Sequence, residues 1–332
     1  MIELRRNPIL SEWIIINDNR EVEHIIKSKK SDTEEEMCPF CVGKEYLTPN
    51  AIMSLDKNGQ FTQDIKKWEV RVIPNNKPIL AIESTLNRRA DGVYDKMNGA
   101  GAHEIIIETP DHNKKIQNYS IAELSRIFDV MQSRINDLKN DLRFEYILAF
   151  KNHGLEAGET ITHSHTQLVA MPIIPKVIKK EMNVSKKYYE FKERCLFCDI
   201  IDQEITSGAR VVVETSNFVA FAPYASRYPF ETWILPKEHG MDFCCINDKS
   251  KKDDLASILI NVMKRLYKVL DNPSYNFVMH LLPLKTSFLP YYHWHIEIVP
   301  KITKFTGFEL GTGMYVNPTI PEETAKFLRE AE

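Results

Sequence analysis

The sequence predicts an α+β fold of two similar halves, each an antiparallel, half-barrel-like sheet crossed by one long helix. Two observations carry this prediction. A Cys-x-x-Cys pair, strand-like runs, a histidine, an amphipathic helical run and a His-x-His segment occur twice, in the same order. Each long helical run lies among shorter apolar runs of strand length. We therefore expect an N-terminal domain at 1–180 and a C-terminal domain at 181–332.

The first half begins at the "CPFC" segment (38–41). Strands are expected within 68–78, 103–112, 144–154 and 162–172. Between the second and third of these, Ser120 and Glu123 form a capping-box pair, and apolar residues from Ile121 to Leu138 keep helical spacing. These residues predict a helix that starts directly after Ser120.

The second half repeats this order from the "CLFC" segment (195–198). Strands are expected within 217–229, 230–239, 275–283 and 291–300. The helix occupies roughly 251–271, with a continuous apolar face, and must end before Pro273, because proline cannot continue a helix. The match between the halves is the basis for comparing their histidines and cysteines.

Composition excludes several protein classes. The net charge is only −3, so the chain lacks the basic field of a nucleic-acid binder. The first residues lack the apolar run of a signal peptide, and no apolar run is long enough to cross a membrane. We therefore expect a cytoplasmic protein with no membrane or nucleic-acid partner. Its six cysteines are then candidates for metal binding rather than disulfides.

Aligning the two halves gives two equivalent ligand sets. Each contains two cysteines and two histidines, the number and type of ligands in a closed tetrahedral zinc site. The first set is Cys38, Cys41, His112 and His163, and the second is Cys195, Cys198, His239 and His293. A single histidine after a strand is more often a surface residue, but its counterpart in the other half favours a ligand. Zinc is the expected cofactor.

The segment "THSHTQ" (162–167) holds the candidate catalytic residues. With His163 assigned to metal, His165 lies on the same face of an extended segment and is free to act as a nucleophile toward phosphorus. Gln167, again on that face, can donate a hydrogen bond to a phosphate oxygen. The preceding loop, with Gly158 and Thr160, can present backbone N–H groups and a hydroxyl to phosphate.

The second half lacks this setting. Glu297 occupies the place of Gln167, and its carboxylate would repel phosphate. The approach "TSFLPYYH" (286–293) is bulky and has no glycine. We expect the first half to be catalytic and the second structural, with His295 either a spare ligand or a packed side chain.

The "HSHTQ" motif resembles the His-x-His-x-Gln motif of the galactose-1-phosphate uridylyltransferase branch of the histidine-triad (HIT) superfamily. Hydrolase branches carry a third histidine where this chain has Gln167. The resemblance spans nearly the whole chain. It continues in the segments "RRNPILSEWIIINDNR", "CPFCVGKE", "VRVIPNNKP", "ETPDHN", "FKNHG", "RYPFETWILPKEH" and "KFTGFELGTGMYVNP".

The resemblance implies two tandem HIT-like domains and a double displacement. The residue at the position of His165 attacks the α-phosphorus of a sugar nucleotide, glucose 1-phosphate leaves, and a second sugar phosphate takes the nucleotide from the histidine. Gln167 matches a residue that binds phosphate oxygens. Further family contacts with the nucleotide, the phosphates or the substrate fall at Arg20, Asn75, Asn76, Asn152, Gly158, Thr160, Lys304 and Phe305. A homodimer is implied as well.

Several features separate this chain from the commonest members of the branch. Those have proline between the two histidines, whereas this chain has Ser164, and Thr160 stands where many have serine. The second Cys-x-x-Cys pair and the "GFELGTGMYVNP" segment are closer to a side branch that resembles plant ADP-glucose phosphorylases, which use phosphate as acceptor.

These features leave several functions open. Uridylyl transfer between UDP-glucose and galactose 1-phosphate is the leading hypothesis. Phosphorolysis of ADP-glucose or of a dinucleoside polyphosphate is the closest alternative. A non-catalytic, zinc-stabilised nucleotide-binding module and a zinc-ribbon nucleic-acid binder are further alternatives from other classes, and the acidic net charge argues against the last of these.

Overall fold

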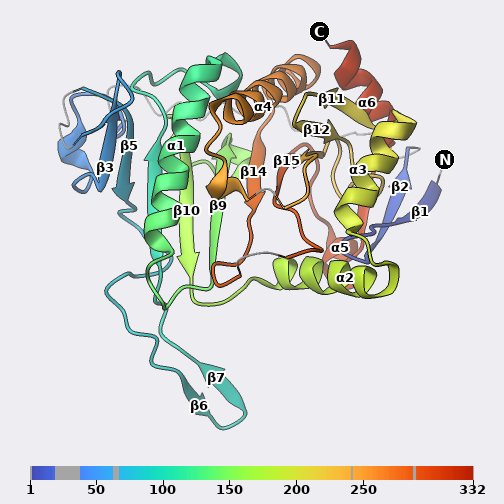
Figure 1. Cartoon of the computed structure of the whole chain (residues 1–332), viewed down its shortest axis with the longest axis horizontal. Helices are drawn as coiled ribbons and strands as arrows, with labels where there is room; N and C mark the ends of the chain where they lie inside the picture. The colour runs from blue at the N-terminus through green and yellow to red at the C-terminus, as the bar shows by residue number, and fades with distance from the viewer. Residues whose placement is uncertain (1, 19–37, 63–66, 241, 287–288, 332) are drawn as a thin grey trace.

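The computed structural model of the chain describes residues 2–18, 38–62, 67–240, 242–286 and 289–331 (Figure 1). One eleven-stranded antiparallel sheet organises the fold, in the order β11-β12-β13-β15-β14-β9-β10-β8-β5-β3-β4. The strands of the first half are β3 (Met53–Asp56), β4 (Phe61–Thr62), β5 (Trp68–Pro74), β8 (Ala102–Ile107), β9 (Tyr146–His153) and β10 (His165–Met171). Those of the second half are β11 (Val211–Glu214), β12 (Phe218–Phe221), β13 (Thr232–Pro236), β14 (Tyr275–His280) and β15 (His295–Pro300).

The two halves of this sheet join through β9 and β14. These strands pair antiparallel, with Asn152 opposite Asn276 and Phe150 opposite Val278. The two predicted half-sheets are therefore one continuous open sheet, in which β10 and β15 occupy equivalent places on either side of the junction. The predicted α+β class and the antiparallel pairing are confirmed.

Two long helices, α1 (Ile121–Leu138) and α4 (Lys249–Leu270), cover one face of the sheet (Figure 1). Both contribute their apolar faces to one large buried cluster that also includes side chains from β8, β9, β10, β14 and β15. The predicted capping box is present at the start of α1, where Ser120 and Glu123 each bond the other's backbone. Helix α4 ends at Leu270, three residues before Pro273, as predicted.

Shorter helices cover the other parts of the second half. Helix α2 (Lys176–Lys192) and helix α3 (Leu196–Ser207) follow the first half in sequence, and Cys195 is the N-cap of α3. Helices α5 (Gly307–Thr312) and α6 (Pro321–Glu330) lie near the C-terminus. A small sheet joins the two ends of the chain, because β1 (Ile2–Arg6) pairs with β2 (Trp13–Asn17) and β2 pairs in parallel with β16 (Tyr315–Asn317). Residues 2–17 therefore pack with the C-terminal part of the chain.

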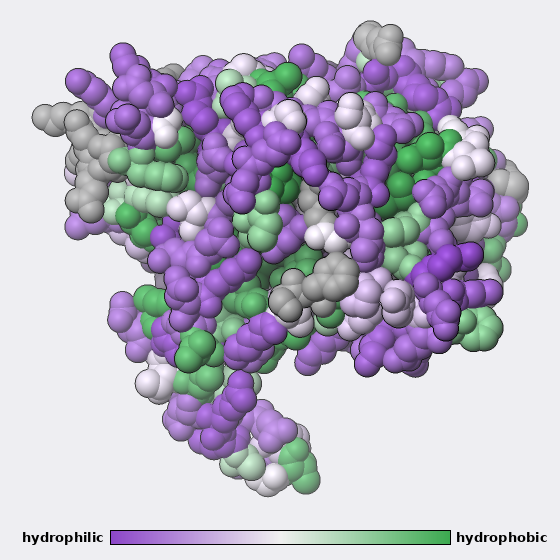
Figure 2. Space-filling model, viewed as in Figure 1, coloured by the Kyte–Doolittle hydropathy of each residue, from purple (hydrophilic) through white to green (hydrophobic). Residues whose placement is uncertain are grey.

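A two-stranded hairpin of β6 (Arg89–Asp91) and β7 (Tyr94–Lys96) projects away from the body (Figure 1). At its turn, Val93 and Tyr94 are largely exposed. Figure 2 shows a mostly hydrophilic surface on the same face of the molecule, with hydrophobic side chains in separate patches, some of them on the projecting hairpin. Among the helices that the structure describes, none has the length and apolar character needed to cross a bilayer.

Candidate active site and metal centres

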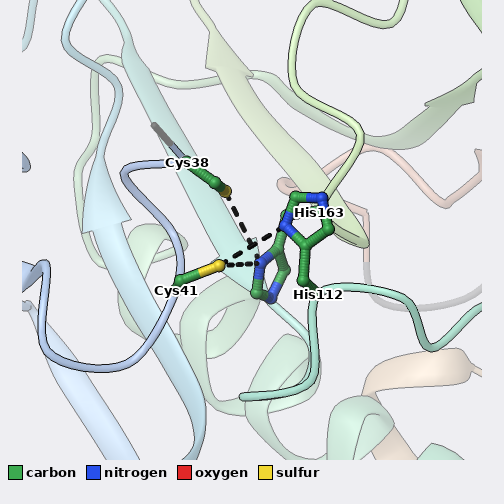
Figure 3. Close-up of side chains that lie close together, drawn as sticks. All are labelled: Cys38, Cys41, His112 and His163. Atoms are coloured by element: carbon green, nitrogen blue, oxygen red, sulfur yellow. Dashed lines mark hydrogen bonds between the residues drawn. The ribbon is translucent and has the colours of Figure 1, made fainter. Parts of the chain in front are cut away.

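The first predicted ligand set comes together in space. Cys38 and Cys41 lie in the segment before β3, His112 follows β8, and His163 precedes β10 (Figure 3). One ligand atom from each of the four lies within 4.8 Å of all the others, and all four residues are buried. The Cys41 sulfur is 3.4 Å from Nδ1 of His112 and 3.6 Å from Nδ1 of His163 (Figure 3).

The hydrogen bonds of the two imidazoles suit metal binding. Nε2 of His163 lies 2.7 Å from the carbonyl oxygen of Thr109, which can only accept, so Nε2 carries the proton and Nδ1 keeps its lone pair. Nε2 of His112 lies 3.3 Å from the Thr162 hydroxyl. Both Nδ1 atoms therefore face the sulfurs, as a tetrahedral Cys₂His₂ site requires. These four residues can hold a metal ion.

His165 opens β10 beside this set and is 5% exposed. Its Nδ1 donates to the carbonyl oxygen of His163 at 2.7 Å, which leaves the lone pair on Nε2. Burial, together with the positive charge of Lys151, lowers the pKa of His165 to about 4. The ring is therefore neutral at physiological pH, the form in which imidazole is nucleophilic.

Gln167 is oriented by a histidine that the sequence did not single out. The backbone N–H of Ile79 donates to Nδ1 of His103, so the proton of this ring is on Nε2, which donates to Oε1 of Gln167 at 2.8 Å. This bond fixes the amide and leaves its NH₂ group for a ligand. Asn75 lies beside the same ring, with its Nδ2 3.1 Å from Nε2 of His103. Asn76, the next residue, is exposed in the turn after β5.

The predicted phosphate loop follows β9. Asn152, on that strand, lies next to the loop, with its Nδ2 3.5 Å from the carbonyl oxygen of Gly158. Gly158 has a left-handed φ of 85°, and Thr160 is exposed. Buried Glu159 anchors the loop by accepting a 2.7 Å hydrogen bond from the backbone of Gly154. The loop therefore presents Gly158 and Thr160 at the surface from a fixed base.

A buried ion pair lies directly behind the His-x-His segment. Nζ of Lys151 donates to Glu108 Oε2 at 2.8 Å, to Ser164 Oγ at 2.7 Å and to the carbonyl oxygen of His165 at 3.2 Å. Glu108 also accepts from the hydroxyls of Ser164, Thr166 and Tyr119. Ser164, between the two histidines, is thus part of a polar network that holds the backbone of His165.

The second predicted ligand set also comes together. Ligand atoms of Cys195, Cys198, His239 and His293 lie within 4.8 Å of one another. The Cys198 sulfur is 3.3 Å from Nδ1 of His239 and 3.4 Å from Nε2 of His293. The hydrogen bond between the two sulfurs lowers the pKa of Cys195 and raises the pKa of Cys198, so the pair shares one proton, with the thiolate favoured at Cys195. This set is less enclosed than the first, because His239 is exposed.

A third group of metal-ligand type was not predicted as a set. Glu181 of α2, His280 of β14 and His295 and Glu297 of β15 are all buried, with ligand atoms within 4.8 Å of one another. Glu181 bonds His280 at 2.9 Å, and Glu297 is ion-paired with Arg227 at 2.6 Å. His295 is thus fully buried in a charged cluster whose side chains are also of metal-ligand type, an arrangement compatible with both roles expected for it.

Two predicted site residues, Lys304 and Phe305, stand apart from this constellation. A third, Arg20, lies outside the described residues. Lys304 and Phe305 are exposed in the second half, where the Phe305 ring contacts Tyr228 and Tyr315. Among the described contacts, none joins this pair to His165 or Gln167 of the same chain.

Comparison with known proteins identifies the family. Residues 179–329 match the C-terminal domain of galactose-1-phosphate uridyl transferase, and residues 91–174 match the N-terminal domain of a family named only as a domain of unknown function, DUF4931. ADP-glucose phosphorylase of Arabidopsis thaliana is 34% identical over 336 residues, which cover 99% of this chain and 92% of that protein. The chain belongs to the galactose-1-phosphate uridylyltransferase family. Its members are nucleotidyltransferases related to the HIT superfamily.

Further relatives support the assignment over the full length. The galactose-1-phosphate uridylyltransferase of Thermotoga maritima is 28% identical over 341 residues, covering 100% of this chain and 99% of the relative. The crystal structure of an Arabidopsis thaliana ADP-glucose phosphorylase with bound ADP-glucose is 32% identical, covers 99% of each chain and superposes with a TM-score of 0.84. The family thus includes both a uridylyltransferase and a phosphorylase among the relatives of this chain.

Proposed function

We propose that His165 is the nucleophile of a ping-pong nucleotidyl transfer from a sugar nucleotide. The observation that carries this proposal is the tautomer of His165, whose Nδ1–H is held by the His163 carbonyl and whose neutral Nε2 is left to attack. Gln167, Asn152, Gly158 and Thr160 would bind the phosphate oxygens. Asn75, Asn76 and Arg20 would bind the nucleotide or its phosphates, and Lys304 and Phe305 would close over the substrate.

The two chemical steps balance without a redox partner. Nε2 of His165 forms a bond to the α-phosphorus, the bond from that phosphorus to the hexose phosphate breaks, and hexose 1-phosphate leaves. A phosphate oxygen of the acceptor then attacks the same phosphorus, the N–P bond breaks, and His165 returns to its neutral form. Since Nδ1–H stays bonded to the backbone throughout, no separate base is needed at this ring.

Two reactions of this kind are candidates. UDP-glucose:hexose-1-phosphate uridylyl transfer, with galactose 1-phosphate as acceptor, is favoured by the matched domain at 179–329 and by the full-length match to the Thermotoga maritima enzyme. ADP-glucose phosphorolysis, with phosphate as acceptor, is favoured by the 34% identity to the Arabidopsis thaliana phosphorylase. It is also favoured by the similarity of this chain's fold to the phosphorylase structure that contains ADP-glucose. Both use the same nucleotidyl-histidine.

One experiment tests the mechanism and separates the two reactions. The protein is incubated with UDP-glucose or with ADP-glucose, and its intact mass and the glucose 1-phosphate released are measured. We expect one UMP or one AMP to be added to wild type and none to His165→Ala. His153→Gln, which changes another buried histidine that bonds Tyr267, should still form the adduct. An adduct on His165→Ala, or none on wild type with either donor, contradicts the proposal. Adding galactose 1-phosphate or phosphate then shows which acceptor discharges the adduct.

We further propose zinc at the two Cys₂His₂ sets, where it would stabilise the loops that carry Cys38, His112 and His163 in the first half and the start of α3 in the second. The donor atoms are those zinc prefers, and metal analysis of the purified protein tests it. The third, carboxylate-containing set is less suited to zinc, since Arg227 and His280 already pair with its carboxylates.

The remaining proposals concern organisation. We propose domains at 1–180 and 181–332, each with half of the sheet and one long helix, and with the N-terminal strands β1 and β2 docked on the second domain. We propose a homodimer, supported by the projecting hairpin with exposed Val93 and Tyr94, and light scattering after gel filtration tests it. The six cysteines form no disulfide, which supports a cytoplasmic location.

A further inference from the structure

A polar row crosses from the second half into the first on the face of the sheet that is turned away from α1 and α4. Asn276 of β14 lies directly across from Asn152 of β9, and both side chains are half-buried. On the other side of β9, Phe150 lies across from Gln167 of β10, so two residues further along these strands Asn152 and His165 are neighbours. Because adjacent strands are about 4.8 Å apart, Asn276 lies roughly 10 Å from the proposed nucleophile. A residue of the second half is therefore close enough to shape the site.

The hydrogen bonds of Asn276 set the direction of its amide. Its Nδ2 donates to the carbonyl oxygen of Ala157 at 2.9 Å and to Oδ1 of Asn152 at 2.9 Å. The carbonyl of Ala157 can only accept, so the NH₂ group of Asn276 must face it. The second hydrogen of the same NH₂ group then points at Asn152, whose contacting atom must be its oxygen.

This bond decides which end of Asn152 faces the proposed phosphate site. With Oδ1 held by Asn276, Nδ2 of Asn152 points toward the loop after β9, where its contact with the carbonyl oxygen of Gly158, at 3.5 Å, is at the outer limit of a hydrogen bond. The hydrogens of this NH₂ group are therefore available to a ligand. His103 orients Gln167 in the same way, by donating to its Oε1. Both amides thus offer donors, the groups that bind an anion, and keep their oxygens away from it.

The internal repeat indicates that the sheet itself does not require an amide at this position. Counting from the residue that lies across from Gln167 in β9, and across from Glu297 in β14, Asn276 corresponds to Leu148. A half-buried leucine therefore serves at the equivalent place in the first half. The amide is present on the side of the junction that holds Asn152 and the phosphate loop.

We propose that Asn276 is a positioning residue for the nucleotidyl transfer, which holds the amide of Asn152 with its NH₂ group toward the phosphate oxygens. This inference rests on the proposed function, because it takes Asn152 as a phosphate ligand, and it adds a residue of the second half to the site. Asn276 acts only through its neighbour. Its loss should therefore weaken nucleotide binding only while Asn152 is present.

A double-mutant cycle in the full-length protein tests the proposal. Every variant also carries His165→Ala, so that no covalent step contributes, and the dissociation constants of UDP and ADP are measured by isothermal titration calorimetry. Asn276→Leu introduces the residue of the equivalent position and should raise the dissociation constant of the tighter nucleotide about 10-fold, because Asn152 can then turn its oxygen toward the phosphate. Added to Asn152→Ala, the same substitution should raise it by less than about twofold.

Val278→Ala is the matched control. Its apolar side chain lies on the same face of β14 and makes no hydrogen bond, so the dissociation constant should stay within about twofold of the reference. If Asn276→Leu weakens binding equally with and without Asn152, Asn276 acts through Ala157 or through the fold, and the proposal is wrong. Failure of both nucleotides to bind the reference protein also overturns it. Adduct formation by wild type, measured separately, tests the nucleophile.

Asn276→Asp provides a second test if Asn276→Leu does not fold. It keeps the size and polarity of the side chain, but its carboxylate accepts from Nδ2 of Asn152 and so turns the oxygen of Asn152 toward the phosphate. Nucleotide binding should weaken about 10–100-fold. Because the new charge also repels phosphate, the same change is made together with Asn152→Ala, where the loss should be smaller by roughly threefold or more. An equal loss in both backgrounds overturns the proposal.

Discussion

Three imidazoles of the candidate site have their tautomers set by single hydrogen bonds. The carbonyl oxygen of Thr109 holds the proton of His163 on Nε2, and the carbonyl oxygen of His163 holds that of His165 on Nδ1. His103 donates from Nε2 to Gln167. His163 therefore directs the lone pair of Nδ1 toward the sulfurs, whereas His165 keeps its lone pair on Nε2, the atom that we propose to attack phosphorus. The difference arises because His163 donates to a backbone carbonyl oxygen through Nε2, whereas His165 donates to one through Nδ1.

Lys151 is expected to position the nucleophile through the His165 carbonyl and Ser164. Lys151→Met leaves Glu108 buried without its counter-charge, which should lower the free energy of unfolding by about 3–5 kcal/mol. It also frees the backbone of His165, so the single-turnover rate of adduct formation should fall roughly 10–100-fold. Urea unfolding and rapid-quench labelling measure the two effects.

A double variant separates stability from positioning. Adding Glu108→Gln to Lys151→Met removes the unpaired charge while keeping partners for the hydroxyls of Ser164, Thr166 and Tyr119. We expect most of the lost stability to return and the adduct rate to stay low. If the rate recovers together with stability, Lys151 has only a structural role.

Glu108 should make stability depend on acid pH. Burial alone would raise the pKa of this carboxyl, but the Lys151 ammonium and hydrogen bonds from Lys151, Thr166 and Ser164 hold it below its usual value. A depressed pKa contributes stability above the unfolded value near 4.5, and this contribution is lost as pH falls through the folded value. The destabilisation caused by Glu108→Gln should therefore be larger at pH 7 than at pH 4 in urea unfolding. An equal difference at both pH values contradicts this.

The sequence predicted which cysteines and histidines cluster better than it predicted the residues that support them. Both Cys₂His₂ sets could be found because the repeat aligns each member with a counterpart. His103, Lys151 and Glu108 have no motif spacing, and their roles arise only when β8, β9 and β10 pair side by side. Glu181 was missed for the same reason, since it reaches His280 from a helix 99 positions away in the chain.

At the scale of elements, the loop after β9 depends on one glycine. Gly154 has a φ of 82°, and a Cβ there would lie 2.0 Å from the Ser274 hydroxyl and 2.9 Å from its Cα. Gly154→Ala should therefore lower the free energy of unfolding by about 3 kcal/mol or more, because of backbone strain and overpacking. It should also displace the loop that carries Gly158 and Thr160. Thermal unfolding and the transfer assay measure these losses.

Gly208→Ala is the matched control for this loop. Gly208 also has a left-handed φ, of 64°, but nothing lies within 4 Å of an added Cβ. Gly208→Ala should lower the free energy of unfolding through backbone strain alone, by about 1–2 kcal/mol, and should leave nucleotidyl transfer unchanged. Equal losses in the two variants mean that the Ser274 contact is not the cause.

The elements that the sequence predicted are those with long periodic patterns. Helices α1 and α4 are present. So are all eight predicted strands, which were expected in 68–78, 103–112, 144–154, 162–172 and their second-half counterparts. Most of these strands are shorter than the runs that predicted them. Helices α2 and α3 were not anticipated, although "CLFC" lies at the start of α3. The pairing of β2 with β16 joins residues about 300 positions apart, which no local pattern can indicate.

At the scale of the whole molecule, one sheet links two halves for which we propose different tasks. β9 and β14 pair at the junction, so β10, which carries His165, and its counterpart β15 belong to one sheet. The first metal set connects the segment before β3, the end of β8 and the start of β10 around His165, whereas the second connects the start of α3 to segments after β13 and before β15. Loss of the first metal should therefore disturb chemistry, and loss of the second should disturb mainly the second half.

Removing each metal separately tests this division. Cys41→Ser and Cys198→Ser should each remove one equivalent of zinc, measured by plasma emission spectrometry. Each should lower stability, by about 4 kcal/mol where free zinc is 1,000 times the dissociation constant. Cys41→Ser should also abolish the nucleotidyl adduct, because His163 holds His165 through its carbonyl, whereas Cys198→Ser should keep it.

Cys245→Ser is the control. It changes an exposed cysteine outside both sets and should retain two equivalents of zinc and full transfer. If Cys198→Ser abolishes the adduct as completely as Cys41→Ser while the protein stays folded, the two halves do not divide the work in this way, and the second metal supports catalysis through the shared sheet.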